Sequence, residues 1–218
     1  MVYSNKRKLL LSGWLMENGQ EEYSSALKLQ KFLFFYEAFT KIAGETPDWY
    51  SLKGYQNGPV FSTVFGDYTH ERSAFDAAAH EEYEASHEHI DETRAIKSSF
   101  ITKIMSEAEL SALTHKLNIW MAKKDRITAG ERQVELCASD LDRNDENILR
   151  ALEQMYTLDF INNSHIIKMD TCYFLFSKDD LPKITENHYD TLGALAESQD
   201  LINPVYVEID DEGRLLID

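Results

Sequence analysis

Apolar residues recur every three or four positions over most of the chain up to residue 160, a pattern typical of helices. The strongest such stretch begins at Ala26, directly after Ser25, which is a good N-cap residue. It runs to Gly44, a residue type that commonly follows helix ends. Its apolar residues cover most of the helix circumference, so we expect this helix to be buried on most sides. A shorter helix is predicted over 7–18, ending before Gly19.

Further helices are predicted over 107–124, 128–138, 145–158 and 184–198, with Asn144 as a possible cap of the third. Residues 48–58 show little periodicity and are expected to be an irregular connection. The sequence Asn57-Gly58-Pro59 indicates a turn, and Pro59 is well placed to begin a new helix. Residues 70–97 are polar and acidic, and they are either a solvated helix or a loosely ordered excursion.

The pattern changes after residue 160. Residues 172–176 form a short run rich in aromatics, which is typical of a strand. Residues 204–209 alternate between apolar and polar, and the turn at 211–213 returns the chain for a hairpin. We therefore predict a mainly α fold with a small C-terminal β element, an α+β class. The helical domain would span residues 1–158, and a C-terminal α/β appendage packed on it would span 159–218.

Charge narrows the classes of partner. The 218 residues include 22 basic and 38 acidic side chains, a net charge of −16. Such a chain is a poor match for the phosphates of nucleic acid or for an anionic membrane, whereas a basic protein partner fits it. Acidic residues are concentrated in 61–100 and 161–218. The simplest explanation of this acidity is that it keeps the protein soluble.

Cysteine usage and hydropathy suggest a cytoplasmic protein. Cys137 and Cys172 show no disulfide or zinc spacing, so both are expected to be free, buried thiols in a reducing compartment. No stretch approaches the roughly 20 apolar residues that a membrane span needs. The apolar run after Lys6-Arg7-Lys8 is short and lacks a cleavage site, so we expect no signal peptide.

Catalytic patterns are absent from the sequence. There is no G-x-S-x-G nucleophile and no glycine-rich phosphate loop, so we expect no catalytic residues, no cofactor and no enzymatic activity. His80, His87 and His89 lie among acidic residues, but their spacing does not place ligands in pairs on one helical face. A solvated acidic segment is therefore favoured over a metal site. A metal-dependent hydrolase that uses residues 80–89 is the weakest alternative.

Two segments together resemble a known family. Leu27-Lys28-Leu29-Gln30-Lys31-Phe32-Leu33 opens the buried helix, and Tyr55-Gln56-Asn57-Gly58-Pro59-Val60 follows about 25 residues later. This pair is similar to the hallmarks of the Panacea domain, which occurs in SocA-type antitoxins and phage-associated GepA-type proteins. The match covers about residues 8–68. The acidic stretch 70–97 is wider than the family pattern, and the family's later His-and-Trp ending has no clear counterpart, although Trp120 lies in that region.

The resemblance implies an antitoxin that neutralises a protein toxin encoded by a neighbouring gene through direct contact. For SocA-like members it also implies coupling to a regulated protease. We expect the partner to contact exposed parts of Lys28, Lys31 and the turn at Tyr55, Asn57 and Gly58, together with the acidic and C-terminal regions. The other matched residues would be structural, namely Leu27, Leu29, Gln30, Phe32, Leu33, Pro59 and Val60.

Gln30 leads to a structural hypothesis. A polar side chain on so apolar a helix needs a hydrogen-bond partner, and we expect Gln30 to bond the backbone of the 55–59 turn. The alternative is that both segments only determine the fold and contact no partner. A different function remains open as well: an acidic, phage-type inhibitor that mimics nucleic acid, with acid clusters at 81–92 and 208–212 as its charge array.

Overall fold

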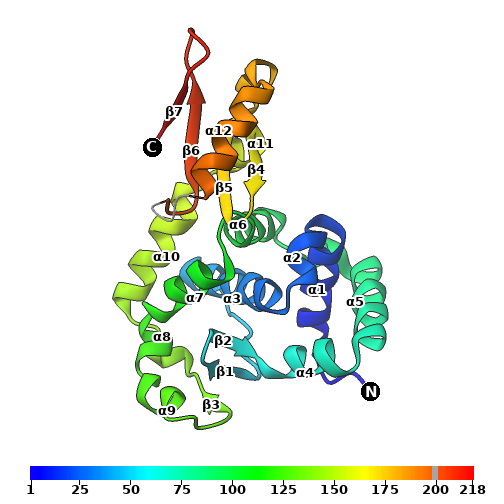
Figure 1. Ribbon diagram of the computed structural model, residues 1–218. Helices are drawn as coiled ribbons and strands as arrows, with labels where there is room; N and C mark the ends of the chain where they lie inside the picture. Colours follow the sequence, from blue (N-terminus) through cyan, green and yellow to red (C-terminus); the bar gives the residue numbers. More distant parts are fainter. Residues whose placement is uncertain (198–200) are drawn as a thin grey trace.

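The computed structural model describes residues 1–197 and 201–218. These residues form a helical unit with a small three-stranded sheet and, at the C-terminal end, a smaller unit built on a four-stranded sheet (Figure 1). The expected class, mainly α with added β structure, is confirmed. The expectation that strands occur only at the C-terminal end is wrong, because one sheet belongs to the helical unit.

The elements of the helical unit follow one another in this order: α1 (Lys6–Asn18), α2 (Gln20–Ser24), α3 (Ala26–Ile42), β1 (Leu52–Tyr55), β2 (Gly58–Phe61), α4 (Ser62–His70), α5 (Arg72–Ser86), the 3₁₀ turn η1 (His87–His89), α6 (Glu92–Lys103), α7 (Glu107–His115), α8 (Asn118–Met121), α9 (Lys124–Thr128), β3 (Val134–Glu135), the 3₁₀ turn η2 (Ala138–Asp140), α10 (Arg143–Met155) and α11 (Leu158–Asn163).

Helix α3 is the centre of the helical unit. Its N-cap is Ser25, whose Oγ accepts a hydrogen bond from the Lys28 amide at 3.1 Å, as expected from the sequence. Helices α1, α2, α6 and α10 and strand β2 pack around it. Five consecutive apolar residues of α3, from Phe32 to Tyr36, are all buried. The expected burial of this helix on most of its surface is therefore confirmed.

The hairpin formed by β1 and β2 replaces the irregular connection expected at residues 48–58. Pro59 does not begin a helix; it lies in β2 opposite Gly54, and α4 begins at Ser62. Strand β2 is at the edge of the sheet β2-β1-β3, where a residue without an amide hydrogen is tolerated. The strands are four residues long, too short to show alternation in the sequence.

Other helix boundaries also differ from expectation. The helix predicted over 107–124 is broken into α7 and α8, and α9 begins only at its last residue. The helix predicted over 128–138 is wrong, because Gly130 has a φ of +83° after α9 and the chain then forms β3 beside β1. Asn144 is not a cap; the side chain of Asp142 accepts from the amide of Asp145 at 2.9 Å. A carboxylate at this place also favours the helix dipole.

The acidic segment 70–97 is largely helical. Helix α5 packs along α1, and a Cβ on Gly13 would lie 2.3 Å from the carbonyl oxygen of Ala79. Glycine at this position therefore permits the close approach of the two helices. Phe75 and Ala79 are buried on the inner side of α5, while Glu81 and Glu84 are exposed. The first of the two expectations, a solvated helix, describes this segment.

The C-terminal unit contains β4 (Ser164–Met169), β5 (Cys172–Ser177), the 3₁₀ turn η3 (Lys178–Lys183), α12 (Glu186–Ala196), β6 (Val205–Ile209) and β7 (Leu215–Ile217). The strand order is β4-β5-β6-β7. Among the described strand pairs, β5 and β6 run parallel, and the other two pairs are antiparallel. The strand at 172–176 and the hairpin of 204–217 are confirmed as β5 and β6–β7. The helix predicted over 184–198 is confirmed as α12, and residue 198 of that prediction lies outside the described residues.

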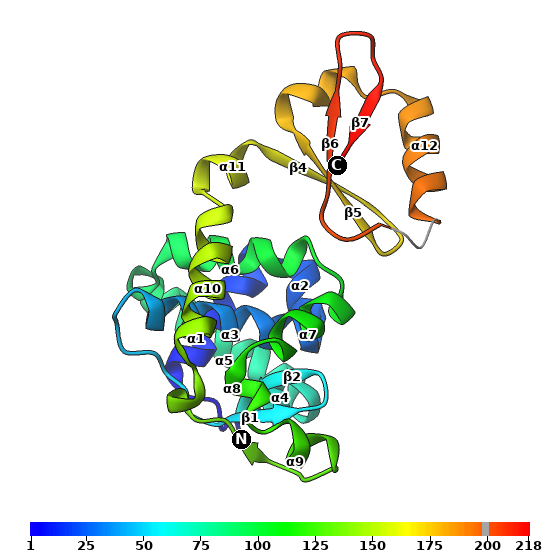
Figure 2. The same cartoon turned by 90° about the vertical axis from the view of Figure 1, so that its left-hand side faces the viewer.

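Each face of this sheet has its own apolar neighbours. Phe174, Phe176 and Val207 form a separate core with Leu192 of α12. Leu175, on the opposite face, belongs to the core of the helical unit. The predicted boundary at 158/159 falls where α11 begins, between α10 and the sheet (Figure 2). The two units therefore share apolar packing at this sheet face.

Two further expectations concern the burial of the cysteines and the absence of a membrane span. Both cysteines are free, but Cys137 is exposed and only Cys172 is buried, so the expectation of burial is wrong for Cys137. Cys137 precedes a surface 3₁₀ turn, where no neighbouring element covers it. Within the described residues, the helices are too short or too polar to cross a bilayer.

Replacing Phe32 with alanine tests the burial of α3. Phe32 is fully buried and stacks on Trp14 with ring centroids 5.6 Å apart. We expect Phe32→Ala to lower the free energy of unfolding by about 3–5 kcal/mol, measured by urea denaturation. The control, Tyr3→Ala, removes a ring that is 68% exposed and should change the free energy of unfolding little. Equal effects of the two substitutions would contradict this account of the core.

Candidate functional site

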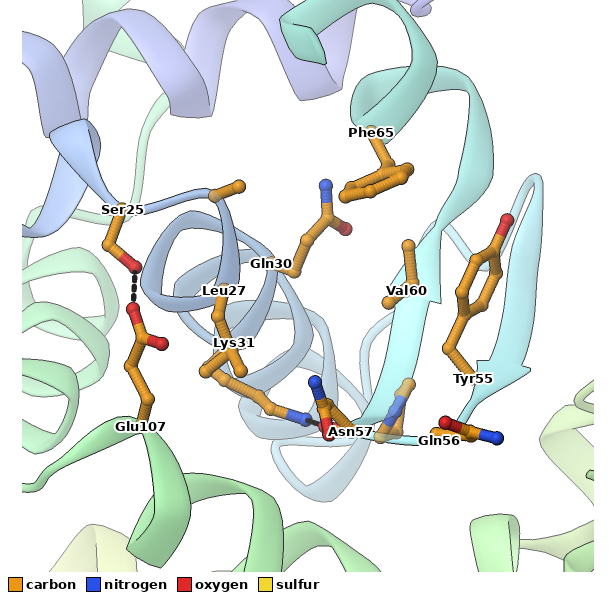
Figure 3. A pocket seen from close by; sticks show the side chains of 12 residues that line it. Ser25, Leu27, Gln30, Lys31, Tyr55, Gln56, Asn57, Val60, Phe65 and Glu107 are labelled. Atoms are coloured by element: carbon orange, nitrogen blue, oxygen red, sulfur yellow. Dashed lines mark hydrogen bonds between the residues drawn. The ribbon is translucent and has the colours of Figure 1, made fainter. Parts of the chain in front are cut away.

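The two segments that carry the family resemblance meet in space. The first turns of α3 lie against the β1–β2 hairpin (Figure 3). Oε1 of Gln30 accepts a hydrogen bond from the amide of Phe61 at 2.7 Å. Nζ of Lys31 donates to the carbonyl oxygen of Asn57 at 2.6 Å. The partner expected for Gln30 is therefore wrong: Gln30 bonds strand β2 just beyond the turn, and Lys31 bonds the turn itself.

A pocket of about 540 Å³ opens where the two segments meet. Figure 3 shows Leu27 and Gln30 of α3 on one side, and Val60 and Tyr55 of the hairpin on the other. Half of the twelve lining residues are apolar or aromatic, and the other half are polar or charged. The complete lining comprises Ser25, Ala26, Leu27, Gln30, Lys31, Tyr55, Gln56, Asn57, Pro59, Val60, Phe65 and Glu107.

The two lysines expected at the surface are buried. Lys28 is 5% exposed and Lys31 is 1% exposed, so their expected exposure is wrong. Lys28 leaves the helix on the side of the C-terminal unit, where its Nζ lies 3.3 Å from the hydroxyl of Tyr173 and 5.0 Å from the centre of that ring. The sequence could not reveal this, because the covering strand follows some 145 residues later.

The remaining motif residues divide into core and pocket. Leu29, Phe32 and Leu33 are fully buried in the core. At the pocket, Leu27, Tyr55 and Val60 are half-buried, Pro59 and Gly58 are buried, and Asn57 is exposed. Of the residues expected to contact a partner, Tyr55 and Asn57 thus offer side-chain surface.

Lys31 is held without a carboxylate. Its Nζ donates to Asn57 and to Oγ1 of Thr114, the latter at 2.8 Å, and both acceptors are neutral. Burial penalises the charged ammonium, which lowers the pKa of Lys31 to about 7. Lys31 therefore fixes the hairpin as a hydrogen-bond donor more than as a charge.

Helices α7 and α8 support the hairpin from the other side. Nε1 of Trp120 donates to the carbonyl oxygen of Tyr55 at 3.0 Å, and the ring of His115 stacks on Trp120 with centroids 3.9 Å apart. Burial, and then the nearby Lys31, lower the pKa of His115. Thr114, His115, Phe65 and Glu107 were not singled out from the sequence, which carries no motif around them.

The histidines considered as metal ligands lie at the surface. His80 of α5 is 3.5 Å from a carboxylate oxygen of Glu17, and His89 of η1 is 3.7 Å from one of Glu88. Within the described part of the chain, the structure contains no cluster of three or more His, Cys, Asp or Glu side chains arranged for a metal ion. The arrangement of these residues gives no support to a hydrolase centred on 80–89.

Comparisons with known proteins return no match: no family model, no curated protein and no solved structure is detectably similar to this chain.

Gly58 is the position where a side chain would disrupt the site. Its φ is +106°, and a Cβ there would lie 2.2 Å from Nζ of Lys31. We expect Gly58→Ala to cost about 2 kcal/mol or more, because both backbone strain and a lost hydrogen bond contribute. Gly66→Ala is a matched control: Gly66 is in helix α4 and a Cβ there meets nothing within 4 Å. The control should be neutral or stabilise by up to about 1 kcal/mol. Similar melting curves for the two variants would contradict the close contact.

The lowered pKa of Lys31 predicts a pH dependence of stability. Between about pH 7 and the ordinary lysine pKa of about 10.4, the unfolded chain holds a proton on this amine that the folded protein lacks. Raising the pH in this window therefore favours the folded state, by at most about 1.4 kcal/mol for each pH unit.

The substitution Lys31→Met isolates this effect. The difference in unfolding free energy between wild type and variant, measured by urea denaturation from about pH 7 to pH 9, should grow with pH in favour of the wild type. Burial raises the pKa of Cys172, so the titration of this thiol lowers stability as the pH rises. This effect is the same in both proteins and cancels from the difference. A difference that does not change with pH would show that Lys31 is not held as a neutral amine.

Proposed function

We propose that this chain is an antitoxin-like binding protein of the Panacea type. It neutralises a protein toxin encoded by a neighbouring gene through direct contact, in the cytoplasm and without catalysis or a cofactor. The pocket between α3 and the β1–β2 hairpin is the proposed contact site. A regulated protease is a second proposed partner, on the strength of the resemblance alone.

One observation carries the proposal. The two segments that resemble the family are separated in the sequence, yet together they line a single pocket. A pair of fold determinants would need only buried contacts, whereas Leu27, Tyr55 and Val60 leave part of their apolar surface to solvent. Half-buried apolar and aromatic side chains around a hollow are typical of protein-binding hot spots.

The acidic inhibitor is less well supported. A mimic of nucleic acid needs a continuous array of negative charge. The candidate acid clusters lie on α5 with η1 and on the β6–β7 hairpin; in Figure 1 α5 is at the side of the helical unit, whereas the hairpin is at the top of the other unit. Binding to the toxin that falls steeply with increasing salt would nevertheless favour the mimic, because contacts through an apolar pocket depend little on salt.

A growth-rescue experiment tests the proposal. The product of the neighbouring gene is expressed alone and together with this protein, and we expect growth arrest in the first case and growth in the second. The variant Val60→Lys places a charge in the pocket at a half-buried position and should abolish rescue. Leu216→Lys makes a similar change on β7, where Leu216 is 51% exposed, and should rescue as wild type does.

Folding must be checked alongside rescue. Both variants should reach wild-type levels in the soluble fraction and melt within a few degrees of the wild type. A harmless neighbouring product would contradict the antitoxin proposal. Full rescue by Val60→Lys would remove the pocket from it.

A further inference from the structure

Gln30 has an unused hydrogen-bond donor that faces the pocket. Its side chain is 2% exposed, and the bond from the Phe61 amide fixes Oε1, which also fixes the orientation of the amide. Nε2 has no acceptor among the described residues. Figure 3 shows this nitrogen pointing away from the hairpin strands, on the side of the pocket where Phe65 lies.

A ligand that enters the pocket and offers an acceptor would complete the hydrogen bonding of this amide. Leu27, Val60 and Phe65 contribute apolar side chains to the same hollow. The pocket volume of about 540 Å³ lies in the range of ligand sites, roughly 300–1,000 Å³. The geometry thus suits a group that combines a carbonyl oxygen with an apolar side chain, as one residue of an extended peptide does.

The rim of the pocket adds a charge. Glu107 is exposed, accepts a hydrogen bond from Oγ of Ser25 at 2.5 Å, and forms no ion pair with the described residues. Lys31, the other charged residue of the lining, has its Nζ bonded to Asn57 and Thr114 and is buried. An incoming segment therefore meets negative charge at the rim, in keeping with the net charge of −16.

We infer that the pocket binds an extended segment of the partner protein in which an apolar residue is followed by a basic one. The apolar side chain enters between Leu27, Val60 and Phe65, its backbone carbonyl accepts from Nε2 of Gln30, and the basic side chain pairs with Glu107. This inference rests on the proposed function for its choice of a protein partner. The recognition itself needs no toxin and can be tested alone.

The probe is a synthetic peptide, acetylated Ser-Leu-Arg-Ser amide, titrated into the full-length protein and followed by NMR. Three contacts supply only modest affinity, so binding in the millimolar range is expected. The side-chain NH₂ resonances of Gln30 should shift, together with the amides of residues 26, 60 and 65. A peptide with Ala in place of Leu should bind at least about tenfold more weakly, which corresponds to the loss of buried apolar surface.

Variants of the protein test each part of the site. Ala26→Leu fills the pocket and should abolish the shifts, whereas Ala77→Leu, at an exposed position of α5, should not. A peptide with Glu in place of Arg should bind to the wild-type protein at least about threefold more weakly than the Arg peptide does. That preference should disappear in Glu107→Gln, which keeps an oxygen for Ser25, and persist in Glu84→Gln on α5.

The outcomes separate the two proposals. Absence of shifts at Gln30 in the millimolar range, equal binding of the Arg and Glu peptides, or binding that survives Ala26→Leu would each overturn the inference. If the peptide binds specifically but the neighbouring gene product is harmless, the peptide-binding role of the pocket is supported and the antitoxin proposal is contradicted. If both Ala26→Leu and Glu107→Gln still rescue growth, the antitoxin proposal is supported and the peptide-binding role of the pocket is contradicted.

Discussion

Helix α3 is covered on nearly all sides, so its polar side chains must find partners inside the protein. Glu37 is fully buried and accepts from Nζ of Lys8 at 2.5 Å and from Nε of Arg7 at 2.8 Å. It also accepts from the amide of Asp48 at 2.9 Å, which ties the chain after α3 back to α3 itself. Such buried ion pairs add little net stability, but breaking one is costly, and they favour one arrangement of the neighbouring elements over others.

The same constraint positions the other neighbours of α3. Gln30 and Lys31 hold the β1–β2 hairpin, and Lys28 faces Tyr173 of the C-terminal unit. The polar residues of one helix thus connect it to several separate parts of the chain. One donor, Nε2 of Gln30, is left over, and it faces the hollow that these contacts create. The site is therefore a consequence of how α3 is buried, and its proposed role in binding builds on that consequence.

The sequence predicted what depends on periodicity. Helix α3, its cap at Ser25, and strands β5, β6 and β7 are recognisable in the sequence, because apolar spacing and capping are local, whereas β4 was not predicted. The contact between the two motif segments was expected, but its details were not. Lys31 bonds a backbone oxygen of Asn57, and because every residue has such an oxygen, the sequence carries no pattern that identifies this acceptor.

The rest of the site depends on tertiary contacts. Phe65 and Glu107 reach the pocket from α4 and α7, and neither belongs to a motif. Lys28 and Lys31 were expected at the surface because lysine is usually exposed, and here long-range packing overrides that preference. The short strands around Pro59 gave no periodic signal at all.

The most direct test of this account is amide hydrogen exchange at Phe61 in the wild-type protein. Phe61 lies in an edge strand, where an unpaired amide would exchange quickly, but its hydrogen bond to the buried Gln30 should protect it. We predict protection close to that of the amides within α3. Exchange as fast as in exposed loops would show that Gln30 does not hold the hairpin, and the pocket would then lose its structural basis.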